Sequence, residues 1–222
     1  MLLSQKYNYK ELDRVTRHGY RHYEVGGNRP LPSVTTVLDS TADKSVLVAW
    51  RERVGEVEAH RISEQSRAVG NQLHLNLENY INHGTKPTGN YFSQVLANLI
   101  IKKGLAHVDE VWGIEAPLFL TDMYAGTVDC VGLHNGEPAI IDFKNSKQDK
   151  KKEWIEDYFL QLIAYAEAHN EMLGTNIQKG VIMMGCHSGR YLEFVIEGAE
   201  WQKYKTMWYD RLYSFYETYK FE

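Results

Sequence analysis

The sequence predicts an α/β fold with a mixed central sheet, formed by a single domain of 222 residues. Helical periodicity dominates the first half of the chain, and three strands, a helix, two strands and a last helix follow. A helix that crosses between strands returns the chain in parallel, whereas hairpin strands are antiparallel, so the sheet is expected to be mixed. Hydrophobic residues make up 43% of the chain, which is enough for a sizeable core.

The N-terminal part of the chain predicts a hairpin followed by helices. Residues 1–30 are rich in tyrosine and are expected to form a β-hairpin with a turn at Gly26-Gly27-Asn28. Pro32 and Ser33 then provide the start signal of a short helix. The helical region covers 31–105, with periodic apolar residues that predict helices over 45–67, 68–82 and 91–103.

Residues 106–222 predict the α/β core. The expected strands are 108–119, 126–133, 139–143, 179–184 and 191–196, and the expected helices are 154–173 and 199–219. Asn135-Gly136 lies between two β-rich runs and is a strong hairpin signal. The second and third strands are therefore expected to pair directly.

This hairpin brings two carboxylates and a lysine together. Pairing of the two strands places Asp129 near Asp142, and Lys144 shares the face of Asp142 because residues two apart in a strand point the same way. Carboxylate oxygens are the ligands that Mg²⁺ prefers. A lysine beside such an ion can stabilise charge that develops during phosphodiester hydrolysis. Taken alone, Asp-x-Lys is a common pattern that usually marks an incidental ion pair at a solvated strand end, and the accompanying residues are what favour the catalytic interpretation.

The pattern Asp129…Asp142-Phe143-Lys144 resembles the core motif of the PD-(D/E)XK nuclease superfamily. The resemblance implies the restriction-endonuclease-like αβββαβ core, with the helical region as an N-terminal elaboration. The run Leu31-Pro32-Ser33-Val34-Thr35, followed by a Gly70-x-x-x-His74 helix, is similar to single-domain RecB-like exonucleases, a branch that includes phage and mitochondrial enzymes. Asp142 stands where some relatives have Glu, and Asn145 where many have Thr. Neither change removes a required chemical group.

The resemblance also implies a set of metal ligands. Asp129 and Asp142 would bind the ion together with the backbone carbonyl of Phe143. Glu115 would assist as a ligand through water or as a hydrogen-bond acceptor, although a strand-edge carboxylate facing solvent is an equal alternative. His74 would contribute its imidazole, which suits Mn²⁺ as well as Mg²⁺.

Other residues are expected to act on the substrate. Lys144 would position the nucleophile or offset charge in the transition state. Gln161 and Tyr165 lie one helical turn apart and could bind phosphate oxygens or orient the lysine. Asn145 and Ser146, directly after the lysine, are candidates for contacts with the DNA backbone.

The implied activity is that of a DNA exonuclease that depends on Mg²⁺, with Mn²⁺ as a substitute, and prefers single-stranded or ended DNA. Contacts directed at the phosphate backbone predict little base specificity. Two alternatives stay open: a structure- or junction-specific endonuclease, and a non-catalytic DNA-binding subunit on the same fold. The intact Asp…Asp-x-Lys set argues against the second.

The charge of the chain does not by itself signal a nucleic-acid partner. The formal net charge is −4, although overall charge says little about one groove. The basic residues gather in groups that suit either solvated faces or a cationic path beside the site. These groups are Arg51, Arg53, Arg61 and Arg67; Lys102 and Lys103; and Lys144, Lys147, Lys150, Lys151 and Lys152.

Cysteine content and hydropathy argue against other classes. Cys130 and Cys186 are too few for the four-cysteine iron–sulfur cluster that some members of the superfamily carry, and both are expected to be buried free thiols. No apolar run approaches the ~20 residues of a membrane span. The N-terminus lacks the apolar core of a signal peptide. We therefore expect a cytoplasmic protein, of a bacterium or a phage-infected host, with DNA and not a membrane as its partner.

Overall fold

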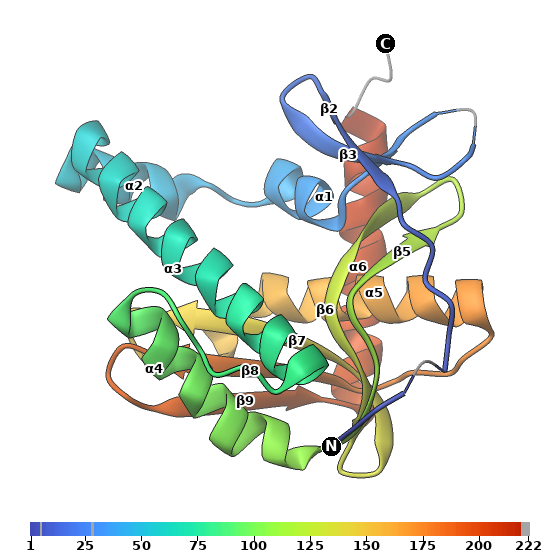
Figure 1. The fold of residues 1–222 in the computed structure, drawn as a ribbon. Coiled ribbons are helices and arrows are strands. Elements are labelled where there is room, and N and C mark those ends of the chain that lie inside the picture. Colours follow the sequence, from blue (N-terminus) through green and yellow to red (C-terminus); the bar gives the residue numbers. More distant parts are fainter. Residues whose placement is uncertain (5, 28, 219–222) are drawn as a thin grey trace.

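A mixed six-stranded sheet runs through the middle of the protein, with strand order β1-β5-β6-β7-β8-β9 (Figure 1). The computed structural model describes residues 1–4, 6–27 and 29–218. The strands of this sheet are β1 (Leu2–Leu3), β5 (Val108–Leu120), β6 (Tyr124–His134), β7 (Glu137–Ser146), β8 (Gly180–Cys186) and β9 (Tyr191–Ile196). β7 and β8 pair in parallel, whereas β5, β6 and β7 pair antiparallel, as do β8 and β9. The predicted α/β class and mixed sheet are confirmed.

Helices cover both faces of the sheet (Figure 1). Val181 and Met183 of β8 pack with α3 and α4, while Ile182 and Met184 pack with α5 and α6, as the alternation of a strand requires. These elements are α3 (Glu56–His83), α4 (Tyr91–Leu99) with a π-helical turn (Ile100–Gly104) and a 3-10 turn (Leu105–His107), a 3-10 turn (Lys152–Trp154), α5 (Glu156–Leu173) and α6 (Gly198–Thr218). The core therefore consists of two main apolar clusters separated by the sheet.

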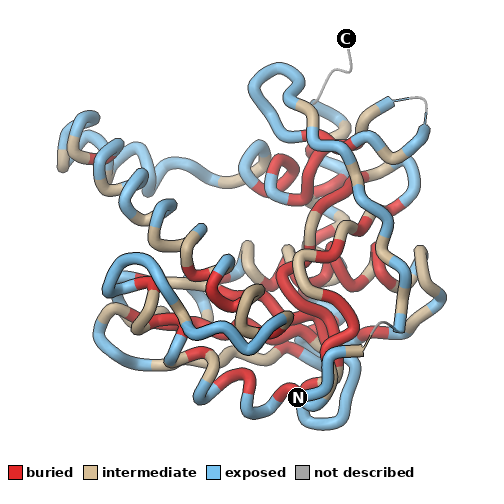
Figure 2. The backbone as a smooth tube through the Cα atoms, in the orientation of Figure 1, coloured by how far each residue is buried: buried red, intermediate tan, exposed pale blue. Residues whose placement is uncertain are grey.

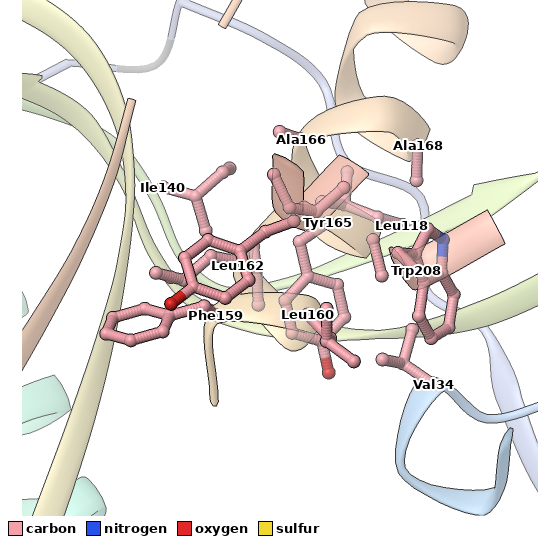
Figure 3. Close-up of a cluster of buried hydrophobic side chains, with 14 of the residues drawn as sticks. Val34, Leu118, Ile140, Phe159, Leu160, Leu162, Tyr165, Ala166, Ala168 and Trp208 are labelled. Carbon is pink, nitrogen blue, oxygen red and sulfur yellow. The ribbon is translucent and has the colours of Figure 1, made fainter. Parts of the chain in front are cut away.

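The crossover helix α5 joins β7 to β8. Glu156 and Asp157 lie in its first turn, where negative charge favours the helix dipole, and the left-handed Gly174 ends it with φ 65°. Its apolar side, including Leu162 and Tyr165, is buried in the larger cluster (Figure 3). The parallel pairing of β7 with β8 that the crossover predicted is present.

The N-terminal hairpin forms, and a third strand extends it beyond the predicted glycine turn. A separate three-stranded sheet contains β2 (Asp13–Arg17), β3 (Tyr20–Glu24) and β4 (Leu31–Pro32). The chain turns at His18 and Gly19, which both have positive φ, of 51° and 80°. Gly26 and Gly27 lie in the connection between the antiparallel strands β3 and β4, so the chain also reverses where the sequence placed its turn, while Asn28 lies outside the described residues.

Ser33 opens α1 (Val34–Thr41) as predicted. Its hydroxyl accepts the backbone N–H of Thr36 at 2.9 Å, which is the usual N-cap bond. Ser33 also forms an isolated parallel bridge with Ala125 of β6, so the start of α1 is fixed to the central sheet.

The helices of residues 45–82 divide at a different place from the predicted one. α2 (Ser45–Val54) ends at Gly55, whose φ of 84° suits glycine, and α3 then continues without a break through Arg67 and Ala68. Periodicity describes the faces of a helix and does not mark a break that depends on one glycine. Figure 2 shows that α2 and the first half of α3 are mostly exposed.

β7 is longer than its apolar run suggested. It continues past Phe143 to Ser146 because its pairing with β8 extends to Cys186. At the other end of the chain, the expected last helix is described as far as Thr218, and its predicted end at Tyr219 lies outside the described residues.

Both cysteines, Cys130 on β6 and Cys186 on β8, are buried free thiols, as the sequence predicted. Within residues 1–4, 6–27 and 29–218, no helix combines the length and the apolar character needed to span a membrane.

Gly132 of β6 lies unusually close to β5. A Cβ atom at this position would lie 2.0 Å from the carbonyl oxygen of Glu110, beside the register shift between Val108 and Glu110. Since a backbone atom of a paired strand has little room to move, we expect Gly132→Ala to lower the free energy of unfolding by about 1–3 kcal/mol or more, measured by urea denaturation. Gly27→Ala is the control, because the nearest atom would be 4.0 Å away. Equal midpoints for the two variants would contradict this close approach.

Candidate active site

β6 and β7 separate at the point where the acidic residues stand. The two strands pair from His134 and Glu137 as far as Cys130 and Ile141. Directly beyond the last pair, the Asp129 carboxylate accepts the backbone N–H of Phe143 at 2.8 Å through Oδ2. A side chain thus takes the position of a strand carbonyl, and Asp129 is held at the gap between the strands.

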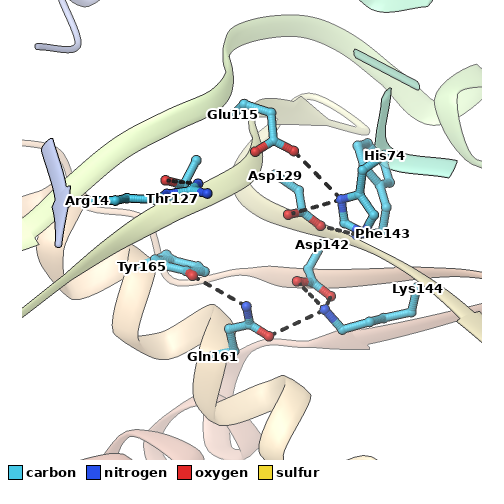
Figure 4. A network of polar contacts seen from close by, with 10 residues as sticks. All are labelled: Arg14, His74, Glu115, Thr127, Asp129, Asp142, Phe143, Lys144, Gln161 and Tyr165. Carbon is cyan, nitrogen blue, oxygen red and sulfur yellow. Dashed lines mark hydrogen bonds and ion pairs between the residues drawn. The ribbon is translucent and has the colours of Figure 1, made fainter. Parts of the chain in front are cut away.

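Asp129, Glu115 and His74 point toward one another (Figure 4). One possible ligand atom from each lies within 4.8 Å of the other two. His74 Nδ1 is 3.5 Å from Asp129 Oδ1 and 3.7 Å from Glu115 Oε1. The fold therefore brings together three of the residues that the sequence proposed as metal ligands.

Glu115 reaches this triad through an unusual backbone conformation. Its φ is 47°, in the left-handed region that non-glycine residues seldom adopt. Ile114 packs with the apolar cluster on the α3 side, whereas Ala116 belongs to the cluster on the α5 side. The alternation of β5 therefore reverses at Glu115, which lies between the strand pairs Ile114–Cys130 and Ala116–Val128. Strain of this kind persists only where the surroundings hold it, and it is common at functional sites.

His74 is presented by the buried half of α3. Leu73 and Leu77 of this helix are fully buried in the cluster that contains Phe143. The His74 ring meets the Phe143 ring edge to face, with centroids 6.4 Å apart. The buried leucines of α3 and the Phe143 ring therefore hold the His74 imidazole next to β7, the strand that carries Asp142.

Lys144 and Asp142 form a buried ion pair next to the triad. Lys144 Nζ lies 2.6 Å from the Asp142 carboxylate, and Asp142 is only 1% exposed. Gln161 Oε1 accepts from the same ammonium at 3.4 Å, and the Gln161 amide donates to the Tyr165 hydroxyl at 3.4 Å (Figure 4). The predicted pair on α5 thus continues the polar chain that begins at Lys144. Its helix comes close to β6 because Gly126 has no side chain: a Cβ there would lie 2.8 Å from the Tyr165 ring.

The charges of the site perturb one another strongly. Burial lowers the pKa of His74, but the Asp129 charge and hydrogen bonds to both carboxylates raise it to about 10. Burial raises the pKa of Asp129, yet His74, Lys144 and the Phe143 N–H lower it overall. For Asp142 burial prevails over the attraction of Lys144, so its pKa is raised. A concentration of shifted groups in one cleft is typical of a functional site.

These residues line a cleft of about 510 Å³ between α3, α5, β6 and the N-terminal hairpin. The sequence-predicted residues that line it are His74, Glu115, Asp129, Lys144, Gln161 and Tyr165. Asp142 does not line the cleft. It lies beneath the cleft surface and forms an ion pair with Lys144, which does line it. Of the basic groups expected to form a cationic path, Lys144 is the member that lines the cleft.

Asn145 and Ser146 do not line the cleft. Ser146 is buried and donates to the backbone carbonyl of Gln148 at 2.6 Å, because β7 continues through this position. Asn145 faces α3, where its Oδ1 would lie 3.2 Å from a Cβ added to Gly70. The Ser146 hydrogen bond therefore helps to hold the end of β7 in place.

Sequence reasoning missed several residues of the cleft. The end of the cleft that lies away from the triad is lined by Arg14, Arg21, Tyr23, Ser33, Thr35 and Thr127. The hairpin that supplies the two arginines has no motif that links it to the acidic residues. Thr127 could have been found, because it stands inside the run Gly126-Thr-Val-Asp129.

The donor set fits a hard divalent cation. Carboxylate oxygens suit Mg²⁺, and the His74 imidazole, whose pKa is raised to about 10, would have to release a proton to coordinate Mn²⁺. Asp142 is buried next to the triad, and Lys144 Nζ lies 2.6 Å from its Oδ2, so the ammonium already balances the charge of this carboxylate. Asp129, Glu115 and His74 would hold the ion, with Asp142 adjacent.

No protein-family model matches the chain, but individual proteins similar to it are known. The chain is similar to mitochondrial genome maintenance exonuclease 1 of Homo sapiens, with 27% identity over 203 residues, and of Mus musculus, with 28% identity over 173 residues. The matches cover 84% and 72% of this chain but 58% and 51% of those proteins. The chain therefore spans about half the length of the curated relatives it matches.

Among solved structures, the chain has a distant likeness to the crystal structure of SSO0001. The TM-score is 0.39 at 16% sequence identity, and the match covers 75% of this chain and 69% of that one. This likeness is too low to inform the site, which rests on the geometry above.

A divalent cation should stabilise the folded protein through the triad. A ligand that binds only the folded state adds about 2.7 kcal/mol when its concentration is about 100 times Kd. We expect Mn²⁺ to raise the Tm of the wild-type chain, and Asp129→Asn and His74→Ala to remove most of this shift. Glu78→Gln is the control, because Glu78 lines the same cleft but is not part of the triad. An undiminished shift in Asp129→Asn would exclude the triad as the metal site.

Proposed function

We propose that this protein is a divalent-metal-dependent DNA exonuclease with a PD-(D/E)XK core of the RecB-like branch. The observation that carries the proposal is the arrangement of Asp129, Glu115 and His74 within 4.8 Å of one another, beside the Lys144–Asp142 pair. Apart from α4 and short helical turns, the order α3, β5, β6, β7, α5, β8 matches the αβββαβ order of that core, which supports the proposal. The exonuclease name of the human and mouse relatives supports the same activity.

The residues of the site have separate roles in this proposal. Asp129, Asp142, Glu115 and His74 hold the cation, with the backbone carbonyl of Phe143 as a further ligand. Bound Mg²⁺ or Mn²⁺ supplies Lewis-acid stabilisation of phosphoryl charge and makes water easier to deprotonate.

Lys144 supplies the positively charged side chain that acts directly on the reacting groups, in addition to the metal ion. Its ammonium is directed by Asp142 and Gln161, so it can donate hydrogen bonds to the attacking water or to a phosphoryl oxygen as negative charge develops. Tyr158 lies on the other side of the ammonium, with its ring centroid 4.9 Å away. Tyr165 and Gln161 orient the lysine from α5. A donor held in this way needs little reorganisation during the reaction.

The substrate in this proposal is DNA that is single-stranded or has a free end. The cleft is lined mainly by charged and hydroxyl side chains, which bind phosphates and carry little base information. The chain is therefore expected to cut with little sequence preference.

Loss of the lysine or its carboxylate partner should abolish catalysis without unfolding the protein. We expect Lys144→Ala and Asp142→Asn to lower the rate of cleavage of labelled DNA in Mg²⁺ by about 100-fold or more, because one preorganised charged donor contributes on this scale. Lys147→Ala, on the same segment but outside the cleft, should cleave at the parental rate. Parental rates for both site variants, with unchanged far-UV circular dichroism, would refute the assignment.

The form of the DNA separates an exonuclease from an endonuclease. With Mg²⁺, linear single-stranded DNA labelled at either end should be degraded, and circular single-stranded DNA of the same sequence should stay intact because it has no end. Linearising the circle at one site should restore degradation. Cleavage of the closed circle by the wild-type chain, absent from Lys144→Ala, would identify an endonuclease instead.

A further inference from the structure

Two arginines of the N-terminal hairpin face the end of the cleft that lies away from the triad. Arg14 pairs with Tyr23 across the hairpin, and Thr16 pairs with Arg21. Because residues two apart share a face, Arg14 and Arg21 are diagonal neighbours on one side of the hairpin. Both line the cleft that contains the metal ligands.

Neither guanidinium meets a carboxylate of the described residues. Within the described ranges, Arg14 and Arg21 form no ion pair with a carboxylate, whereas Arg61 and Arg67 on α3 pair with Glu58 and Glu64. Arg14 instead donates to the Thr127 hydroxyl at 3.4 Å and lies 5.8 Å from the centre of the Tyr23 ring. Two unpaired like charges on one face repel each other, and an anion between them would remove this repulsion.

The start of α1 contributes further donors to the same end of the cleft. Ser33 and Thr35 line it, and the positive end of the helix dipole lies there. The backbone carbonyl of Arg21 accepts hydrogen bonds from the Ser33 N–H at 2.9 Å and from the Thr36 hydroxyl at 3.0 Å. These bonds fix β3, which carries Arg21, beside the start of α1. The arginine side chains and the hydroxyl groups of Ser33 and Thr35 therefore lie at the same end of the cleft.

This cationic end has a fixed distance from the triad. Thr127 and Asp129 both line the cleft from β6, and residues two apart on a strand are separated by about 7 Å. The two ends therefore serve different groups of one extended ligand, because a single phosphate cannot occupy both.

We propose that Arg14, Arg21, Thr127 and the start of α1 form a subsite for one non-scissile backbone phosphate of the strand being cut. The inference rests on the proposed function, since it takes the cleaved strand as the ligand. Paired guanidinium groups bind phosphate oxygens in bidentate fashion, and a helix N-terminus favours the same charge. The subsite positions the strand and carries no base information.

The test uses linear single-stranded oligonucleotides in which one phosphate at a time is replaced by a neutral methylphosphonate. For the wild-type chain we expect one position, separate from the scissile bond, to raise KM about tenfold or more with little change in kcat, as for loss of a charged hydrogen bond. In the double variant Arg14→Gln/Arg21→Gln, KM should already be raised, and that position should have no further effect. Arg17→Gln is the control, because Arg17 lies on β2 but does not line the cleft.

The same oligonucleotides, measured by fluorescence anisotropy without cleavage, separate this inference from the proposed function. Binding by the wild-type chain should depend more steeply on salt than binding by the double variant, by about one ion per lost phosphate contact. If the double variant shows the wild-type methylphosphonate profile and salt slope, the subsite is wrong even when cleavage is normal. If no DNA is cleaved but the profile still depends on the two arginines, the subsite stands and the nuclease assignment fails.

Discussion

The geometry of the site depends on one substitution of hydrogen-bond partners, in which the Asp129 carboxylate takes the place of a strand carbonyl. Its Oδ2 accepts the N–H of Phe143 at 2.8 Å, so β6 and β7 can separate without leaving that buried donor unpaired. The separation gives Lys144 access to the cleft, with Asp142 buried beneath it, while the rest of the ladder stays intact. Asp129 Oδ1 remains directed at His74. One residue therefore ends the strand pairing and begins the candidate metal site.

Packing on both faces of the sheet holds the charged groups in position. Burying Asp142 and Lys144 costs solvation, and their contact at 2.6 Å offsets that cost only because both are fixed. Leu73 and Leu77 anchor the helix that carries His74 in the cluster on one face of the sheet. α5, with Gln161 exposed to the cleft, is anchored in the cluster on the other face. His74 on α3 and Gln161 on α5 thus approach the site from opposite sides of β6 and β7, and each helix is anchored in its own apolar cluster.

The sequence predicts the parts of this site that depend on strand pairing and helix periodicity. An Asn-Gly turn fixes the register that brings Asp129 and Asp142 together, and a crossover helix explains the parallel strand. Other parts depend on contacts that no local pattern contains. The left-handed φ of Glu115 reverses the alternation of β5, and Ser146 is buried because β8 extends the pairing of β7. Arg14 enters the cleft through tertiary packing of the hairpin alone.

A net charge of −4 is consistent with a polyanionic ligand because the charges of the cleft are separated along one strand. The acidic triad at Asp129 repels phosphate until a cation neutralises it, whereas the arginines beside Thr127 attract phosphate without any ion. An anionic strand can therefore approach the cationic end first and reach the acidic end only where a metal offsets the carboxylates. Since β6 is a central strand of the sheet, the spacing between the two ends is rigid. This rigidity would align a backbone on the metal by its phosphates alone, which is why the overall charge of the chain carries so little information about its ligand.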